Sequence, residues 1–238
     1  MPSLSELLKT IEQTFEVHFE PLKVGEQTFE VLTIDNMRQH LDGLLKKKAI
    51  KNPLHDLPLW AKVWPSSFVL GWLLSKYAQE GQSLLELGCG LGITGLLATN
   101  YPLKKIVISD VNAEALNFAR ANVLQNHLED RLSVQRLDVN VREKLDDLPD
   151  FDLIIASELL YLKELHRPII KLLEKKLKED GTALFCTDFA RRQPSFAKLA
   201  KRYLTVQESH FKVKSVDEEG QTENRLYQIY ILTKTQAS

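Results

Sequence analysis

The chain has 238 residues, more than the ~150 typical of one domain, which suits one large domain with an appendage. Its composition is 44% hydrophobic and 26% charged, the ordinary range of globular proteins, and this excludes a disordered or fibrous protein. Lysine and arginine total 31 against 32 aspartate and glutamate residues, a net charge of −1. This balance disfavours bulk electrostatic binding of nucleic acid.

Cysteine usage and hydropathy narrow the class of protein further. Cys89 and Cys186 lie far apart without a CxxC partner, so we expect neither a disulfide framework nor a thiolate metal site. None of the 6 histidines has metal-like spacing. No apolar stretch approaches the ~20 residues that span a bilayer, and the N-terminus lacks the pattern of a secretory signal. We therefore expect a cytoplasmic monomer without a bound metal or membrane contact.

The N-terminal residues have a different pattern from the rest of the chain. Their expected elements are a helix over 4–11, hairpin strands over 15–19 and 29–32, and a second helix over 35–47. We expect these elements to form a small helix and hairpin appendage over 1–55, lying against the acceptor side of the cleft. Residues 56–238 would form the main domain.

After residue 80, short apolar runs alternate with longer amphipathic ones. The predicted strands are 83–87, 105–109, 132–137, 151–156 and 183–187, and the predicted helices are 93–100, 113–126 and 166–179. This alternation indicates βαβ units and an α/β fold with a doubly wound, Rossmann-like, mainly parallel sheet. Two last strand-like runs, 204–213 and 225–233, have only a polar loop between them and predict an antiparallel pair at one edge.

The strongest local signal is a strand that runs into a glycine-rich turn and then a helix. The turn reads Gly88-Cys89-Gly90-Leu91-Gly92. With Gly95 it also satisfies the dinucleotide pattern GxGxxG, so the glycines alone leave NAD and S-adenosylmethionine (AdoMet) open. Glu86 in the strand favours AdoMet, because a carboxylate there repels a pyrophosphate and accepts the AdoMet ammonium group.

Two further acids end the next two strands. Asp110 is placed to accept hydrogen bonds from both ribose hydroxyls, which suits NAD and AdoMet equally. Asp138 is placed to reach the adenine amino group. Either acid alone could belong to a helix N-cap, since Asn112 and Asn140 follow in cap-like positions. Together with Glu86 they favour a cofactor site at the carboxyl ends of the strands.

These motifs, with the antiparallel end of the sheet, make about residues 58–238 resemble the class I, seven-β-strand AdoMet-dependent methyltransferases. The resemblance implies a strand order of 3-2-1-4-5-7-6 with the last strand antiparallel. It also implies methyl transfer from AdoMet by direct displacement, with S-adenosylhomocysteine as the product.

The methyl acceptor is expected where the strand 151–156 runs into Ser157-Glu158-Leu159-Leu160-Tyr161. The Asn-Pro-Pro-Tyr motif of base and amide methylases is absent, which counts against DNA, rRNA and glutamine acceptors. Glu158 and Tyr161 would share a face of a short turn, where a carboxylate orients an ammonium group beside a ring. We therefore predict them as catalytic residues for an amine acceptor; the alternative is an acid at a helix start with a surface tyrosine.

A second resemblance concerns this acceptor. Glu158-x-x-Tyr161 resembles the Asp/Glu-x-x-Tyr motif of a branch that methylates protein lysines, including electron-transfer flavoprotein β-subunit and chaperone lysine methyltransferases. The segment 58–65, Pro-Leu-Trp-Ala-Lys-Val-Trp-Pro, is similar to that branch's Trp-Ala-x-x-Trp-Pro. The implied cofactor contacts are Trp64, Gly88, Cys89, Gly90, Asp110, Val139 and Ser157. Many members have Trp where Val139 stands, so the adenine is expected to meet a different side chain here.

Three classes of function stay open on the sequence. They are a protein-lysine methyltransferase, a small-molecule N- or O-methyltransferase, and either an NAD-binding oxidoreductase or a non-catalytic module of the same fold. Trp60, Trp64 and Trp72 also fit a role as core aromatics. Arg191 and Arg192, after the fifth strand, either contact an acidic substrate protein or belong to a plain loop.

Overall fold

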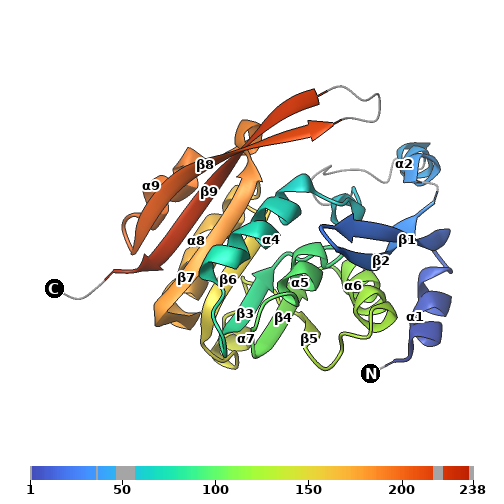
Figure 1. Cartoon of the computed structure of the whole chain (residues 1–238), viewed down its shortest axis with the longest axis horizontal. Helices are drawn as coiled ribbons and strands as arrows, with labels where there is room; N and C mark the ends of the chain where they lie inside the picture. Colours follow the sequence, from blue (N-terminus) through green and yellow to red (C-terminus); the bar gives the residue numbers. More distant parts are fainter. Residues whose placement is uncertain (1, 36, 47–56, 217–221, 236–238) are drawn as a thin grey trace.

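The computed structural model describes residues 2–35, 37–46, 57–216 and 222–235. A seven-stranded sheet forms the centre, with helices on both faces, and a separate hairpin with two helices lies at one side (Figure 1). The strands of the sheet are β3 (Ser83–Leu87), β4 (Lys105–Asp110), β5 (Leu132–Arg136), β6 (Phe151–Ser157), β7 (Leu177–Asp188), β8 (Leu204–Val216) and β9 (Thr222–Lys234).

The strands follow the order β5-β4-β3-β6-β7-β9-β8. β3 to β7 run parallel, whereas β9 pairs antiparallel with both β7 and β8. Counted from β3 as the first strand, this is 3-2-1-4-5-7-6, so the predicted order and the antiparallel last strand are confirmed. The carboxyl ends of the parallel strands meet at one edge, and the order reverses between β3 and β6, where sheets of this class form a ligand crevice.

Both faces of the sheet are covered. The helices that cover them are α4 (Pro65–Tyr77), α5 (Ile93–Ala98), α6 (Ala113–Gln125), α7 (Arg142–Asp146), α8 (His166–Lys176) and α9 (Pro194–Ala200). Side chains alternate along each strand, so Leu84 and Ile155 pack with α4, α5 and α6, while Leu85 and Ile154 pack with α7, α8 and α9. Burial on two sides explains why the predicted strands read as continuous apolar runs.

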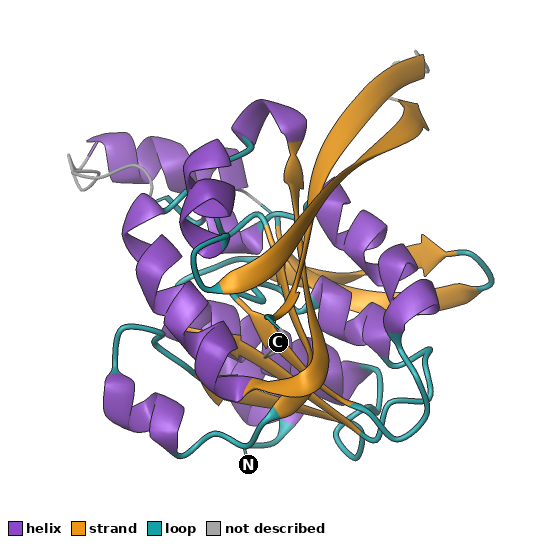
Figure 2. Cartoon of the chain, turned by 90° about the vertical axis from the view of Figure 1, so that its left-hand side faces the viewer, coloured by secondary structure: helices purple, strands orange, loops and turns teal. Residues whose placement is uncertain are grey.

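The structure departs from the sequence expectations at element ends. α8 ends at Lys176 instead of continuing to 179, because Leu177 already pairs with Phe151 as the first residue of β7. The patterns did not predict the short helices α7 and α9. β8 and β9 also extend beyond their predicted ends, and they continue past the end of β7 as a twisted two-stranded arm (Figure 2).

The N-terminal appendage has the predicted helix, hairpin and second helix. Its elements are α1 (Leu4–Ile11), β1 (Val17–Val24), β2 (Gln27–Ile34) and α2 (Met37–Lys46). The hairpin turn contains Gly25 at φ +63°, a conformation that favours glycine. Residues 47–55, and with them the predicted boundary between 55 and 56, lie outside the described residues.

The appendage packs on α6. Phe15 is buried against Phe118, with ring centroids 5.7 Å apart. The Asn122 side chain accepts a hydrogen bond from the Leu32 N–H at 2.7 Å, and Asn126 bonds both backbone groups of another β2 residue. These contacts place the appendage over α6, the helix between β4 and β5. Its position against the acceptor side of the cleft stays a prediction.

Candidate active site

A cavity of about 410 Å³ opens at the carboxyl ends of β3, β4 and β6. Eleven of the twelve predicted site residues line it: Trp64, Glu86, Gly88, Cys89, Gly90, Asp110, Asp138, Val139, Ser157, Glu158 and Tyr161. Gly92 is not among the lining residues. It is the N-cap of α5 at φ +80°, and a Cβ there would lie 2.9 Å from Ile108 Cδ1, so turn geometry and packing favour glycine at this position of the motif.

The glycine-rich turn brings the backbone close to the cavity. Gly90 has φ +52°, and a Cβ at this position would lie 2.7 Å from the backbone carbonyl oxygen of Trp60, in η1 (Leu59–Ala61). Its N–H donates a hydrogen bond to Asp110 Oδ2 at 3.0 Å. The turn is thus fixed between a 3-10 helix on one side and the acid that ends β4 on the other.

Glu86 is the least satisfied polar group of the site. It is 2% exposed, and its Oε2 atom has no hydrogen-bond partner; the hydroxyl oxygen of the neighbouring Thr94 has none either. Burial raises the pKa of Glu86 to about 8, an effect that the backbone N–H of Gly95 opposes only in part, and the charge of Asp110 adds to it. A cationic group in the cavity would supply the missing partner, so this carboxylate fits the ammonium of AdoMet and does not fit a pyrophosphate.

Asp110 and Asp138 lie where the sequence predicted them. Asp110 accepts hydrogen bonds from the backbone N–H groups of Gly90 and Asn112, and burial raises its pKa. Asp138 accepts from the backbone and the side-chain amide of Asn140, through Oδ1 alone. Val139 and other apolar side chains complete this wall of the cavity, as a nucleoside would require.

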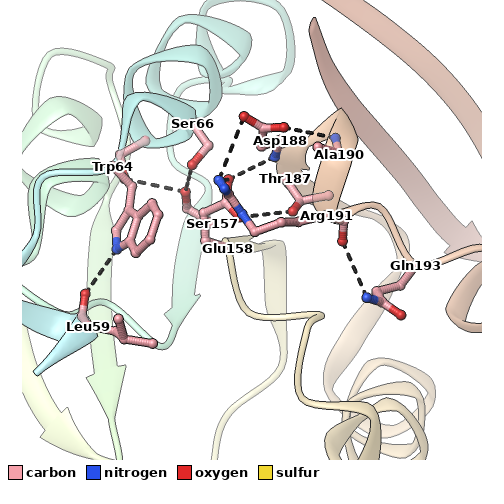
Figure 3. Close-up of polar contacts among 11 residues, drawn as sticks. Leu59, Trp64, Ser66, Ser157, Glu158, Thr187, Asp188, Ala190, Arg191 and Gln193 are labelled. Atoms are coloured by element: carbon pink, nitrogen blue, oxygen red, sulfur yellow. Dashed lines mark hydrogen bonds and ion pairs between the residues drawn. The ribbon is translucent and has the colours of Figure 1, made fainter. Parts of the chain in front are cut away.

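Serine side chains connect the end of β6 to the start of α4. The Ser157 hydroxyl donates to Ser66 Oγ at 2.8 Å, and the Ser67 hydroxyl donates to Ser157 at 3.4 Å. Trp64 precedes α4, and its indole Nε1–H donates to the Leu59 carbonyl at 3.0 Å (Figure 3). The indole is therefore held in one orientation in the cavity wall.

Glu158 adopts an unusual backbone conformation with φ +50°, and it turns its side chain toward the end of β7. Four donors reach its carboxylate (Figure 3). Oε2 accepts from the Thr187 hydroxyl and Arg191 Nε, both at 2.9 Å, and Oε1 accepts from the Asp188 N–H at 2.8 Å and Arg191 Nη2 at 3.0 Å. The side chain is only 4% exposed, and the bidentate guanidinium neutralises it.

Tyr161 faces the same cavity. Burial raises the pKa of its phenol, and the nearby carboxylates of Asp110, Glu158 and Glu164 add to the effect. The carbonyl of Leu160, just before it, contacts His166 Nε2 at 2.7 Å, which ties this loop to the first residue of α8.

Sequence reasoning missed the partners that hold these residues. Arg191, in η3 (Phe189–Arg191), was considered only as a surface contact, and its guanidinium also lies 5.1 Å from the Trp64 ring centroid. Thr187 and Asp188 were not singled out. The position of Asp188, an acid at the end of a parallel strand like Asp110, was the one signal that could have indicated them.

Within the described ranges, no group of three or more His, Cys, Asp or Glu side chains is arranged to hold a metal ion. In the same part of the chain, no helix has the length and apolar character needed to span a membrane.

Comparison with known proteins assigns the family. The family model described as lysine methyltransferase matches residues 49–206. Calmodulin-lysine N-methyltransferase of Arabidopsis thaliana is 30% identical over 130 residues, 51% of this chain and 43% of the relative. Protein N-lysine methyltransferase METTL21A of Danio rerio is 31% identical over 157 residues, 63% of this chain and 71% of the relative.

A solved structure, precorrin-6y C5,15-methyltransferase from Geobacter metallireducens, shares the fold with a TM-score of 0.56 at 20% identity, covering 70% of this chain and 88% of that one. The protein is an AdoMet-dependent class I methyltransferase. More specifically, the chain belongs to the lysine methyltransferase family, and the predicted resemblance to the protein-lysine branch is confirmed.

Proposed function

We propose that this enzyme binds AdoMet in the cavity and transfers its methyl group to the Nζ atom of a lysine in a protein substrate. The observation that carries the cofactor half is the buried Glu86 carboxylate, whose Oε2 atom has no hydrogen-bond partner in a cavity that two further acids line. The names of the relatives support the acceptor half, since they describe lysine methylation of proteins.

The residues of the cofactor half have distinct roles in this proposal. Glu86 binds the ammonium group of the cofactor, Asp110 binds the ribose hydroxyls, and Asp138 reaches the adenine amino group beside Val139. Gly88, Cys89 and Gly90 supply a close backbone approach, since a side chain at Gly90 would collide with Trp60. When bound, AdoMet supplies a sulfonium methyl group, whose C–S bond breaks, leaving its electron pair on sulfur, as the lysine nitrogen forms the new C–N bond.

On the acceptor side, Tyr161 would contact the lysine side chain, and the expected cofactor contacts Trp64 and Ser157 line the same cavity. A lysine with an ordinary pKa near 10.4 must lose its proton before its nitrogen can attack. A slot lined by an indole and a phenol lowers that pKa, because it desolvates the ammonium form. In this proposal Tyr161 contacts the amine, and Glu158 shapes the loop from which Tyr161 projects.

We also propose how the whole protein is organised and where it acts. We infer a division into residues 1–55 and 56–238, a monomer, a cytoplasmic location and no bulk binding of nucleic acid. The net charge of −1 and the two buried free thiols of Cys89 and Cys186 support this inference. Light scattering on the purified protein tests the oligomeric state.

Radiolabelled AdoMet, incubated with the enzyme and the proteins of a cell lysate, tests the function. We expect a labelled protein band whose acid hydrolysate contains methyl-lysine, and calorimetry should detect AdoMet but not NAD. E86A should lose AdoMet binding, whereas R192M, at an exposed position outside the cavity lining, should retain it. Label confined to the low-mass fraction would overturn the protein-lysine acceptor, and intact AdoMet binding by E86A would overturn the cofactor site.

A further inference from the structure

The acceptor side of the cavity contains a carboxylate that is already fully engaged. Glu158 lines the cavity, yet its two oxygens accept four hydrogen bonds, two of them from Arg191 (Figure 3). A planar guanidinium that meets both oxygens cancels the charge as well as occupying the lone pairs. Glu158 therefore has no capacity left to bind the ammonium group of a lysine, the role that the sequence suggested for it.

The charge of this carboxylate matters because the acceptor must react as a neutral amine. A carboxylate without a counter-ion, within about 4–6 Å of an amine, favours the ammonium form and raises the amine pKa by about 1–3 units. At neutral pH such a carboxylate would bind the lysine more tightly but keep it protonated. The rate of methyl transfer would therefore fall, while the affinity for the substrate would not.

We propose that Arg191 is a positioning residue that neutralises Glu158 on the acceptor side of the cavity by holding it in an ion pair. An incoming lysine is then not stabilised as an ammonium ion by a free carboxylate. This inference rests on the proposed lysine acceptor. Arg191 has the reach for this role because it belongs to η3, directly after β7, and β7 itself supplies the other two donors to Glu158.

The contacts of Arg191 also keep it in place. Its guanidinium lies 3.8 Å from Asp188 Oδ2 and 5.1 Å from the Trp64 ring, so an anion and an aromatic face hold it in addition to Glu158. The hydrogen bond to Glu158 raises the pKa of Arg191, and an arginine side chain keeps its charge throughout the pH range of the test below. The side chain is 42% exposed, at the rim and not inside the cavity.

Other ionisable groups act on this pair or on the neighbouring Tyr161 from the surrounding elements. They are Tyr161 on the loop after β6, Glu164 in η2 (Lys163–Leu165), Asp110 at the end of β4, Cys186 and Asp188 on β7, and Tyr227 on β9. Lys62, near η1, adds a cation 4.7 Å from the Trp64 ring. These groups are the same in all the variants below. A shift in the pH dependence of the rate that follows the charges of residues 158 and 191 is therefore caused by that pair.

The test measures the rate of methyl-lysine formation between pH 6 and 10, with labelled AdoMet and lysate proteins as acceptors. The acid limb of the profile is the pH range in which the rate rises as the lysine loses its proton. Removing the cation in R191M should move this limb upward by about one pH unit or more. The rate at pH 7 should then fall roughly tenfold and recover at high pH. R191K keeps the charge and should keep the limb in place. R191M/E158Q removes both charges and should return the limb to within about 0.3 unit of wild type.

Two controls separate a charge effect from damage to the fold. R192M removes the adjacent exposed arginine, which does not contact Glu158, and should leave the profile unchanged. Calorimetric affinity for S-adenosylhomocysteine should be equal in wild type and in the Arg191 variants. In that complex, n-butylammonium measured by NMR at pH 7 should bind R191M more tightly than wild type.

The failures of the two proposals are distinguishable. If wild type forms no methyl-lysine at any pH, the proposed function is wrong. If wild type does form it, but the profile of R191M is lower and unshifted, the inference is overturned. Should R191M be inactive at every pH, an active R191M/E158Q supports the inference and an inactive one overturns it.

Discussion

Glu86 is expected to lower the stability of the ligand-free enzyme as pH rises. Its pKa is about 8 in the folded protein, against a reference value of 4.5 that represents the unfolded chain. Between these values the folded protein binds a proton that the unfolded chain has released, so the free energy of unfolding falls by about 1.4 kcal/mol per pH unit. Over the whole titration, from well below the lower pKa to well above the higher one, the loss reaches about 5 kcal/mol, and below the lower pKa it disappears.

E86Q isolates this effect because an amide of nearly the same shape does not titrate. Guanidinium unfolding of E86Q and wild type at pH 5, 6, 7 and 8, without AdoMet, gives the difference between them at each pH. That difference should move in favour of E86Q by about 3.5 kcal/mol from pH 5 to pH 8. A constant offset reports how the amide packs, so only the change with pH is the test.

Two comparisons make the result decisive. E129Q removes an exposed carboxylate and measures what the loss of one negative charge does by itself. Saturating AdoMet should abolish the pH-dependent loss in wild type, because an ammonium bound to Glu86 stabilises its ionised form. A difference between E86Q and wild type that stays constant from pH 5 to 8 would refute the conclusion that burial raises the pKa of Glu86.

The other predictions concern the same site and its supports. G90A should lose at least tenfold in AdoMet affinity, because its Cβ would lie 2.7 Å from the Trp60 carbonyl oxygen. G25A, whose Cβ would meet nothing within 4 Å, bears only the left-handed strain of about 1–2 kcal/mol and should keep its affinity. Equal affinities of the two variants by calorimetry would contradict this. N122A should lose about 2–4 kcal/mol in guanidinium unfolding, since two buried backbone groups lose a partner, and a loss below about 1 kcal/mol would contradict it. AdoMet binding at pH 7 should release about one proton from Glu86, measured by calorimetry in buffers of different ionisation enthalpy, and an absence of release would show that Glu86 is already ionised.

The sheet and much of the site were predictable from local sequence. Strands buried on both faces read as apolar runs, and their alternation with helices permits few topologies. Parallel strands bring their carboxyl ends to one edge, so Glu86, Asp110 and Asp138, each at or near the end of such a strand, were expected to meet, and the cavity is lined by all three.

The remaining features depend on contacts between distant residues. Nothing in the spacing indicates that Asn122, on α6, accepts a hydrogen bond from the Leu32 N–H, 90 residues earlier, yet this contact helps to place the appendage on α6. Gly92 shows a different limit, because its φ of +80° favours glycine whether or not the residue contacts the cofactor. A glycine in the sequence does not say whether a ligand, a turn or a packed neighbour requires it, and only the structure distinguishes these reasons.

The acceptor motif is the clearest case of such a limit. Glu158-x-x-Tyr161 suggested a free carboxylate beside a ring, because two residues three apart were expected to share one face. The left-handed backbone at Glu158 separates them: Tyr161 faces the cavity, while the carboxylate turns to β7 and to Arg191, 33 residues later. An acid that was expected to bind a cationic substrate is thereby paired with a cation of the enzyme, and the site is left suited to an amine in the neutral form that methyl transfer requires.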